Sequence, residues 1–218
     1  MNSKEKSKII LRELNKIYPK VPIPLNYKNT FTLLISVLLS AQCTDVNVNN
    51  VTKNIYPKYN HPKHFVKLGR KKIEQLIKKI GIFRIKAKSI YFLSKTLVEK
   101  YKSKVPRTYE ELESLPGVGH KTASVVMSQA FGYPAFPVDT HIHRLAQRWG
   151  LTNGKNVVQT EKDLKKIFPK KHWNKLHLQI IWYGRKYCKL EIVTEFLVKF
   201  VKAVIQAEKS QLKQRKHN

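Results

Sequence analysis

Apolar residues recur at intervals of three and four along almost the whole chain, and this spacing constrains the fold more than any other feature. The pattern is clear from Ile10 to Ile17, from Val66 to Ile80 and from Ile90 to Tyr101. It is typical of amphipathic helices, and no convincing alternation of apolar and polar residues indicates a strand. Short segments rich in proline or glycine separate about ten such helices. The sequence therefore predicts an all-α protein.

The chain carries a large excess of positive charge. It has 43 Lys and Arg against 14 Asp and Glu, a net charge of +29, and 42% of its residues are hydrophobic. That hydrophobic content is too high for a disordered basic tail, so we expect a folded protein. Nucleic acid is the partner that best offsets such a charge, because binding to phosphates releases condensed counterions. Two alternatives remain: coding bias toward lysine, and a membrane surface, which the scattered basic runs favour less.

Neither the amino terminus nor the cysteines point to secretion. The first residues mix charges with apolar residues at helical spacing and lack the apolar core of a signal peptide. The longest apolar stretch, from Phe31 to Cys43, contains polar residues and is too short to span a membrane, so we expect a buried helix. Cys43 and Cys188 are too few for a disulfide framework and are expected to be free thiols. We therefore expect a cytoplasmic protein with no membrane partner.

The most informative segment is TYEELESLPGVGHKTASVVMSQA, residues 108–130. Thr108 and Glu111 fit a capping box that opens one helix, and Leu115-Pro116 ends it. Gly117 and Gly119 follow in a tight turn, where glycine can take backbone angles closed to other residues. Backbone amides at the start of the next helix can bind phosphate without reading base sequence. Taken alone, the segment also fits an ordinary helical hairpin with glycine at its turn.

The chain resembles the helix-hairpin-helix DNA glycosylases, and among them the endonuclease III family. The resemblance rests on LPGVGHKTA at 115–123 followed by VDTHIHR at 138–144, and it extends to LLSAQCTDVNVN, IKKIGIFRIKA and NGKNV. It implies a two-lobed helical fold with a DNA cleft between the lobes. The first lobe is a helical barrel over residues 21–131, which contains the hairpin at about 108–130. The second combines residues 1–20 with 132–218.

Two residues are candidates for catalysis. Lys121 lies in the first turn of the helix after the hairpin, and a deprotonated amine is a nucleophile. The resemblance implies that Lys121 attacks the sugar C1′ of a damaged nucleotide and displaces the base; without it, a phosphate contact or a solvated side chain would be the better interpretation. Asp139 precedes an apolar helical pattern and fits a helix N-cap. The resemblance gives it a second catalytic role, and a capped, oriented carboxylate is compatible with both.

Further residues are candidates for binding DNA. An enzyme that extrudes a base must fill the space left in the stack. By the family pattern Gln42 hydrogen-bonds the orphaned partner base, and Ile82 wedges between base pairs. Gly117, Val118 and Gly119 form the phosphate-binding turn, and His141 supports the pocket. His141 and His143 do not indicate zinc, because residues two apart on a helix face different directions and no third ligand is near.

The sequence departs from the family at its iron-sulfur cluster. The family binds a 4Fe–4S cluster through four cysteines, and Cys188 is the only ligand position that this chain retains. The other three positions hold Glu195, Val198 and Val204. Since this type of cluster needs four thiolates, the sequence predicts no cluster and no metal. Apolar residues from Ile192 to Ile205 share one helical face and predict a long amphipathic helix in its place.

Together these features predict a monomeric bifunctional enzyme of base excision repair. It would remove oxidised pyrimidines from double-stranded DNA and cleave 3′ to abasic sites by β-elimination through a lysine imine. One alternative is a monofunctional adenine-type glycosylase of the same superfamily, which Ser36, at a position where that branch has glutamate, and the presence of Lys121 both oppose. The other is a non-catalytic helix-hairpin-helix DNA-binding protein, which would have no need for Lys121 and Asp139 together.

Overall fold

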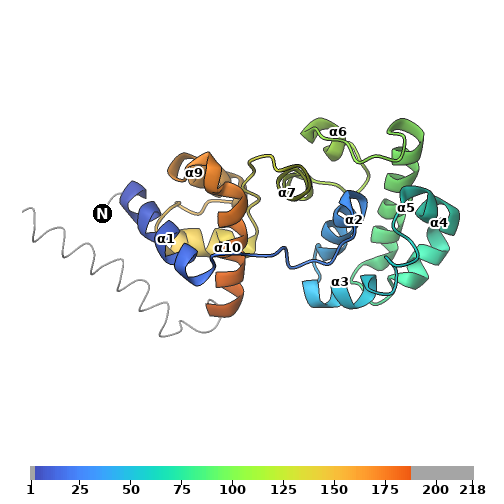
Figure 1. The fold of residues 1–218 in the computed structure, drawn as a ribbon, viewed down its shortest axis with the longest axis horizontal. Helices are drawn as coiled ribbons and strands as arrows, with labels where there is room; N and C mark the ends of the chain where they lie inside the picture. The colour runs from blue at the N-terminus through green and yellow to red at the C-terminus, as the bar shows by residue number, and fades with distance from the viewer. Residues whose placement is uncertain (1–2, 188–218) are drawn as a thin grey trace, which may run out of the picture. The chain divides into compact units, whose positions relative to one another are not determined.

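The computed structural model of the chain describes residues 3–187, and the regular secondary structure of these residues is helical (Figure 1). The predicted all-α class is confirmed. Ten α-helices and one 3-10 helix follow one another within the described residues: α1 (Ser3–Ile17), α2 (Thr30–Ser40), α3 (Asp45–Thr52), α4 (Pro62–Leu76), α5 (Phe83–Lys100), α6 (Tyr109–Glu113), α7 (His120–Phe131), α8 (Thr140–Arg148), α9 (Val157–Ile167), η1 (Lys170–His172) and α10 (Trp173–Tyr187).

The chain divides into two compact units. The hairpin unit is Ile23–Ala135, and the terminal unit combines Met1–Pro22 with Phe136–Asn218. The terminal unit is described at residues 3–22 and 136–187. The boundaries lie after residues 22 and 135, where the sequence led us to expect them after 20 and 131. The amphipathic helix expected from Ile192 to Ile205 lies outside the described residues.

Helix α2 is the buried centre of the hairpin unit. Every residue from Phe31 to Leu39 is buried, as expected for the longest apolar stretch of the sequence. Asn29 and Thr32 begin the helix with a reciprocal capping box. Helices α3, α5 and α7 pack against α2, and α4 packs along α5 (Figure 1). This arrangement puts the amino-terminal turns of α5 and α7 in the same unit as the carboxy-terminal end of α2.

The terminal unit joins the two ends of the described chain. Helix α10 packs against α1 and α8, and α9 packs against α8 and α1. Gln179 of α10 donates from Nε2 to the carbonyl oxygens of Leu14, at 3.3 Å, and Tyr18, at 2.9 Å, so it caps the end of α1. Trp182 donates from Nε1 to the carbonyl oxygen of Pro22 at 3.0 Å. These bonds fix the start of the chain on a helix about 160 residues later.

No helix within residues 3–187 combines the length and the apolar character needed to cross a membrane.

Candidate DNA-binding and catalytic site

The helix-hairpin-helix consists of α6, a turn over residues 114–119, and α7. Thr108 caps α6, because its hydroxyl oxygen accepts from the amide of Glu111 at 3.3 Å. The expected capping box is only half formed: Glu111 Oε2 accepts from the Thr108 hydroxyl at 3.0 Å, and the reciprocal bond to the Thr108 amide is not made. Val118 is buried and donates from its amide to the Leu115 carbonyl, which closes the turn. The turn is therefore fixed from within.

The two glycines of the turn are required for different reasons. Gly117 has φ +80°, and a Cβ there would lie 2.6 Å from Ser89 Cβ of α5, so both the backbone angle and the space demand glycine. Gly119 has φ −99°, which any residue adopts, and a Cβ there would have no described atom within 4 Å. Of the two glycines, Gly117 uses a backbone angle that other residues avoid and Gly119 does not. The open space around Gly119 leaves room for an external group beside the start of α7.

Lys121 lies in the first turn of α7, as the sequence predicts. Its side chain is exposed, and among residues 3–187 no hydrogen bond or ion pair holds its amine. The preceding His120 is oriented differently: its Nδ1 lies 2.8 Å from Glu113 Oε1, and its ring stacks on Tyr109 of α6. Because the N-cap residue is Gly119, the cap supplies no side-chain acceptor to the amides of this turn.

Asp139 and His141 lie in the terminal unit, at the start of α8. Asp139 is the N-cap, and its Oδ1 accepts from the amide of Ile142 at 2.8 Å, so the predicted cap is confirmed. His141 Nδ1 lies 3.1 Å from a terminal nitrogen of Arg144. His143 has another partner, the Thr160 hydroxyl of α9, at 2.8 Å. The two histidines are thus bound to different groups.

Gln42 and Ile82 lie on two touching loops of the hairpin unit. Gln42 follows the end of α2, and Ile82 is the N-cap residue of α5. Both are exposed, and both have left-handed backbone angles, with φ +53° at Gln42 and +50° at Ile82. The loops approach at Gly81, where a Cβ would lie 3.4 Å from the Gln42 carbonyl oxygen. Non-glycine residues rarely adopt such angles. The few that do are concentrated at functional sites.

Lys86 was not identified from the sequence. This residue of α5 binds the end of α2, directly before Gln42, and lies four residues after Ile82. Its side chain is buried in α5, and its Nζ donates to the carbonyl oxygens of Leu39 and Ala41 at the end of α2. The spacing carried a signal, because Lys86 occupies the same helical face as the buried residues Ile90, Leu93 and Leu97. A lysine at a core position of a helix requires specific acceptors.

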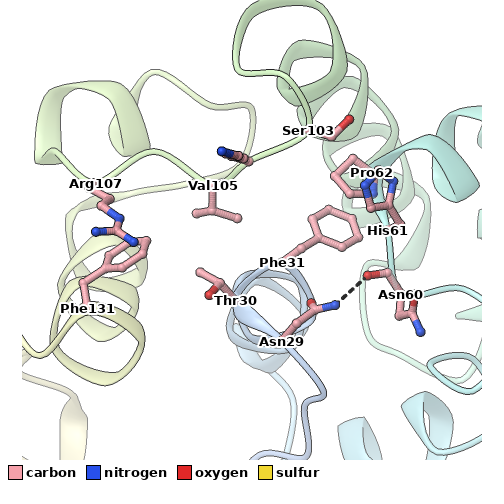
Figure 2. A pocket seen from close by; sticks show the side chains of 11 residues that line it. Asn29, Thr30, Phe31, Asn60, His61, Pro62, Ser103, Val105, Arg107 and Phe131 are labelled. Atoms are coloured by element: carbon pink, nitrogen blue, oxygen red, sulfur yellow. Dashed lines mark hydrogen bonds between the residues drawn. The ribbon is translucent and has the colours of Figure 1, made fainter.

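An open cavity of about 280 Å³ lies elsewhere in the hairpin unit (Figure 2). It is lined by the start of α2, the start of α4 and the segment between α5 and α6, and it contains none of the residues predicted to act on DNA. Asn29 donates across one side of it to the Asn60 carbonyl oxygen at 2.9 Å, and Arg107 lies over the Phe131 ring. Two of its polar side chains, Asn29 and Arg107, thus already have partners in the cavity wall.

The residues present do not fit the cluster of the family. Cysteines number two in the whole chain, Cys43 and Cys188, and four thiolates are needed. The Cys43 sulfur accepts from the Asn47 side chain at 3.3 Å beside the Gln42 loop. Within residues 3–187 no three His, Cys, Asp or Glu side chains lie where they could share a metal ion. Positions 188, 195, 198 and 204 lie outside the described residues.

Comparison with known proteins agrees with these features. Residues 35–170 match the model of the HhH-GPD superfamily of base excision DNA repair proteins. The chain is 43% identical to endonuclease III of Bacillus subtilis over 83% of each chain. It is 42% identical to that of Escherichia coli over 85% of this chain and 88% of the relative.

Solved structures give the same result. A trapped covalent intermediate of endonuclease III with DNA superimposes with a TM-score of 0.84 at 44% identity, covering 88% of this chain and 91% of that one. A thermostable thymine-DNA glycosylase, at 22% identity and a TM-score of 0.73, shares the fold. The chain therefore belongs to the endonuclease III family of HhH-GPD base excision repair proteins, and it is a DNA glycosylase.

Proposed function

We propose that this DNA glycosylase is also an abasic-site lyase, and that it acts on oxidised pyrimidines in double-stranded DNA with Lys121 as nucleophile. The observation that carries the proposal is an exposed amine in the first turn of α7, directly after the hairpin turn. The similarity to a trapped covalent complex of endonuclease III with DNA supports it, because covalent trapping requires a protein nucleophile. Duplex DNA is the partner that the charge of +29 and this similarity both favour.

The chemistry has two stages, displacement of the base and cleavage of the strand, and ends with release of the enzyme. The Lys121 amine forms a bond to C1′ as the bond from C1′ to the base breaks, and the base leaves with the electron pair and takes up a proton. The sugar ring then opens, O4′ gains a proton, and an imine links Nζ to C1′. This imine acidifies C2′, so loss of a C2′ proton expels the 3′ phosphate as the C3′–O bond breaks. Water finally hydrolyses the imine and releases the enzyme.

Asp139 is the proposed partner of Lys121. Its carboxylate is oriented by the bond from the Ile142 amide, and one oxygen remains to stabilise an electron-poor sugar or to accept a proton. Because asparagine is also a good N-cap, Asp139→Asn removes the charge and keeps the cap. This substitution separates catalysis from folding.

The alternatives receive less support. Ser36 is fully buried, donates to the Asn26 carbonyl oxygen at 2.9 Å, and lies 2.6 Å from the hydroxyl of Tyr56. Burial raises the pKa of Tyr56, so this pair is neutral. These bonds give Ser36 a structural role, and nothing in its surroundings resembles a catalytic acid. An exposed lysine beside a hairpin turn also suits a phosphate contact in a non-catalytic binder, but such a binder would have no need for Lys121 and Asp139 together.

Borohydride trapping tests the proposal. Duplex DNA with one oxidised pyrimidine is incubated with wild type, Lys121→Gln and Asp139→Asn, with and without borohydride, which reduces the imine to a stable amine. We expect wild type to give both an adduct and a strand break, and Lys121→Gln to give neither. Asp139→Asn should keep its melting temperature and lose base release by about 10² or more.

DNA-binding measurements on the same variants show what a loss of activity means. Binding of each variant to the same duplex at one salt concentration shows whether DNA affinity has been kept. Base release without any adduct or nick in wild type would establish a monofunctional glycosylase and refute the lyase step. Tight binding with no base release from several oxidised pyrimidines would refute both activities.

A further inference from the structure

The amino-terminal turns of α5 connect three parts of the proposed DNA-binding surface. Ile82 is the N-cap residue of the helix, Lys86 lies one turn later, and Ser89 follows in the next turn. Lys86 binds the loop that carries Gln42, and the Ser89 side chain packs beneath Gly117 of the hairpin turn. One stretch of eight residues thus contacts both loops and the hairpin.

Lys86 is an unusual core residue. It is 3% exposed, and among residues 3–187 no carboxylate pairs with it. Its Nζ lies 2.9 Å from the Leu39 carbonyl oxygen and 2.5 Å from that of Ala41. These carbonyls end α2, where the helix dipole places partial negative charge, so a cation is favoured there. Burial still lowers the pKa of Lys86, because desolvation disfavours its charged form.

A second side chain, that of Asn47, ties the same loops. Asn47 of α3 donates from Nδ2 to the Lys79 carbonyl oxygen at 2.9 Å and contacts the Cys43 sulfur. Lys79 lies in the loop between α4 and α5, three residues before Ile82, and Cys43 directly follows Gln42. The loops that carry Gln42 and Ile82 are therefore linked both through Lys86 and through Asn47.

We propose that Lys86 is a positioning residue, which holds Gln42 and Ile82 as one rigid unit so that both enter the space left by an extruded base. The inference rests on the proposed function, since it requires that these two residues fill that space. Both have left-handed backbone angles that a non-glycine residue keeps only when its surroundings impose them. Lys86 supplies that constraint by fixing the last carbonyl before Gln42.

The geometry distinguishes this role from simple packing. If Lys86 only filled space in the core, methionine or leucine would do so equally well without burying a charge. The lysine instead donates hydrogen bonds to the carbonyl oxygens on either side of Ser40, the last residue of α2, directly before Gln42. Removing the ammonium should therefore release the Gln42 loop while leaving the apolar core of the unit filled.

The test compares Lys86→Met with Lys95→Met, which removes an exposed lysine from the same helix. Two substrates are used: duplex DNA with one oxidised pyrimidine, and single-stranded DNA with one abasic site, which has no orphaned base. We expect Lys86→Met to lower base release from the duplex by about ten- to a hundredfold, because small misplacements have effects of this size. Cleavage of the single strand should stay within about twofold of wild type, since only the duplex needs the two fillers.

Two further readouts separate positioning from a structural role. With 2-aminopurine opposite an abasic site, the fluorescence change on binding reports how the orphaned base is held. This change should be lost in Lys86→Met and kept in Lys95→Met. In a double-mutant cycle, Gln42→Ala should cause little further loss in the Lys86→Met background, because the two residues act as a unit.

Each outcome decides the inference. Equal duplex activity of folded Lys86→Met and Lys95→Met overturns it, as does an equal loss on both substrates or full additivity with Gln42→Ala. Should Lys86→Met not fold, Asn47→Ala, which removes the second link between the loops, must show the same duplex-selective loss or the inference fails. A wild-type protein that neither traps nor releases a base refutes the proposed function instead, whatever the Lys86 variants do.

Discussion

At the scale of single residues, the two glycines of the hairpin turn differ in whether they could be replaced by another residue. Gly117 has a positive φ and no room for a Cβ, whereas Gly119 has an ordinary φ and open space around it. Gly117→Ala should therefore destabilise the protein by about 2–4 kcal/mol through strain and a clash with Ser89. Gly119→Ala should change stability by less than about 1 kcal/mol, because the lower entropy of the unfolded chain opposes the poorer N-cap that alanine makes. Chemical denaturation of both variants measures the difference.

For DNA affinity we expect the opposite order, with the larger effect in Gly119→Ala and the smaller in Gly117→Ala. If the start of α7 receives a phosphate, a methyl group at position 119 lies where the backbone must approach it, so Gly119→Ala should weaken binding of a stable protein. Folded Gly117→Ala, measured well below its melting temperature, should be affected less. Unchanged affinity in Gly119→Ala would show that no phosphate approaches this turn.

The sequence predicts single residues well where side-chain chemistry is local. Asp139 before an apolar helical pattern was enough to predict an N-cap, and the cap is present. The left-handed angles of Gln42 and Ile82 could not be predicted, because neither is glycine and the constraint comes from Lys86 and Asn47, distant in sequence. At Gly119 residue type does not determine the backbone angle, because its φ of −99° suits any residue.

At the scale of elements, helix α4 depends on the protonation of its own cap. His61 is the N-cap residue, and its Nδ1 accepts from the Lys63 amide at 3.3 Å, which requires the neutral ring. Burial lowers the pKa of His61 below its ordinary 6.5, and the neighbouring His64 and Lys63 act in the same direction. A similar effect, from burial and from Lys171 and Lys175, lowers the pKa of His172.

These shifts predict a loss of stability in mild acid. Below about pH 6.5 the unfolded chain binds a proton at His61 that the folded chain does not, so the free energy of unfolding falls until the lower folded pKa is reached. Above that pH both states are neutral and the contribution is complete. Denaturation curves between about pH 7.5 and about pH 5 should show a shallower decline for His61→Asn, since asparagine caps the helix without titrating. His172→Asn should add to this effect, and identical slopes in all three proteins would contradict it.

Helices could be predicted from the sequence where one face of the helix, or the whole helix, is buried. The apolar stretch from Phe31 to Cys43 identified α2, although the helix ends at Ser40 and leaves Gln42 in a turn. In α4 the periodicity extends across Gly69, where the backbone leaves helical geometry with φ +71°. Helical spacing resumes in phase beyond the kink, which is why the pattern alone did not reveal it.

At the scale of the whole molecule, each of the two units has its own apolar core within the described residues. The terminal unit buries Leu14, Leu145, Leu164 and Tyr183 among others, and Gln179 fastens α1 to α10. This assembly could be anticipated only from the family resemblance, because the periodicity of α1 says nothing about which distant helix it meets. The sequence nevertheless bears directly on the cofactor, since the ligands of a cluster are cysteines.

Iron analysis tests the whole molecule for a cluster. Because Glu195, Val198 and Val204 stand where three thiolates would be needed, purified protein should contain less than about 0.1 iron per chain and lack sulfide. Cys188→Ser should keep the melting temperature, DNA affinity and base release of wild type, since a lone thiol carries no cluster. Protein from iron-depleted cells should match protein from replete cells in all three. About four irons per chain, or loss of folding in Cys188→Ser together with loss of visible absorbance, would show that ligands other than these cysteine positions hold a cluster.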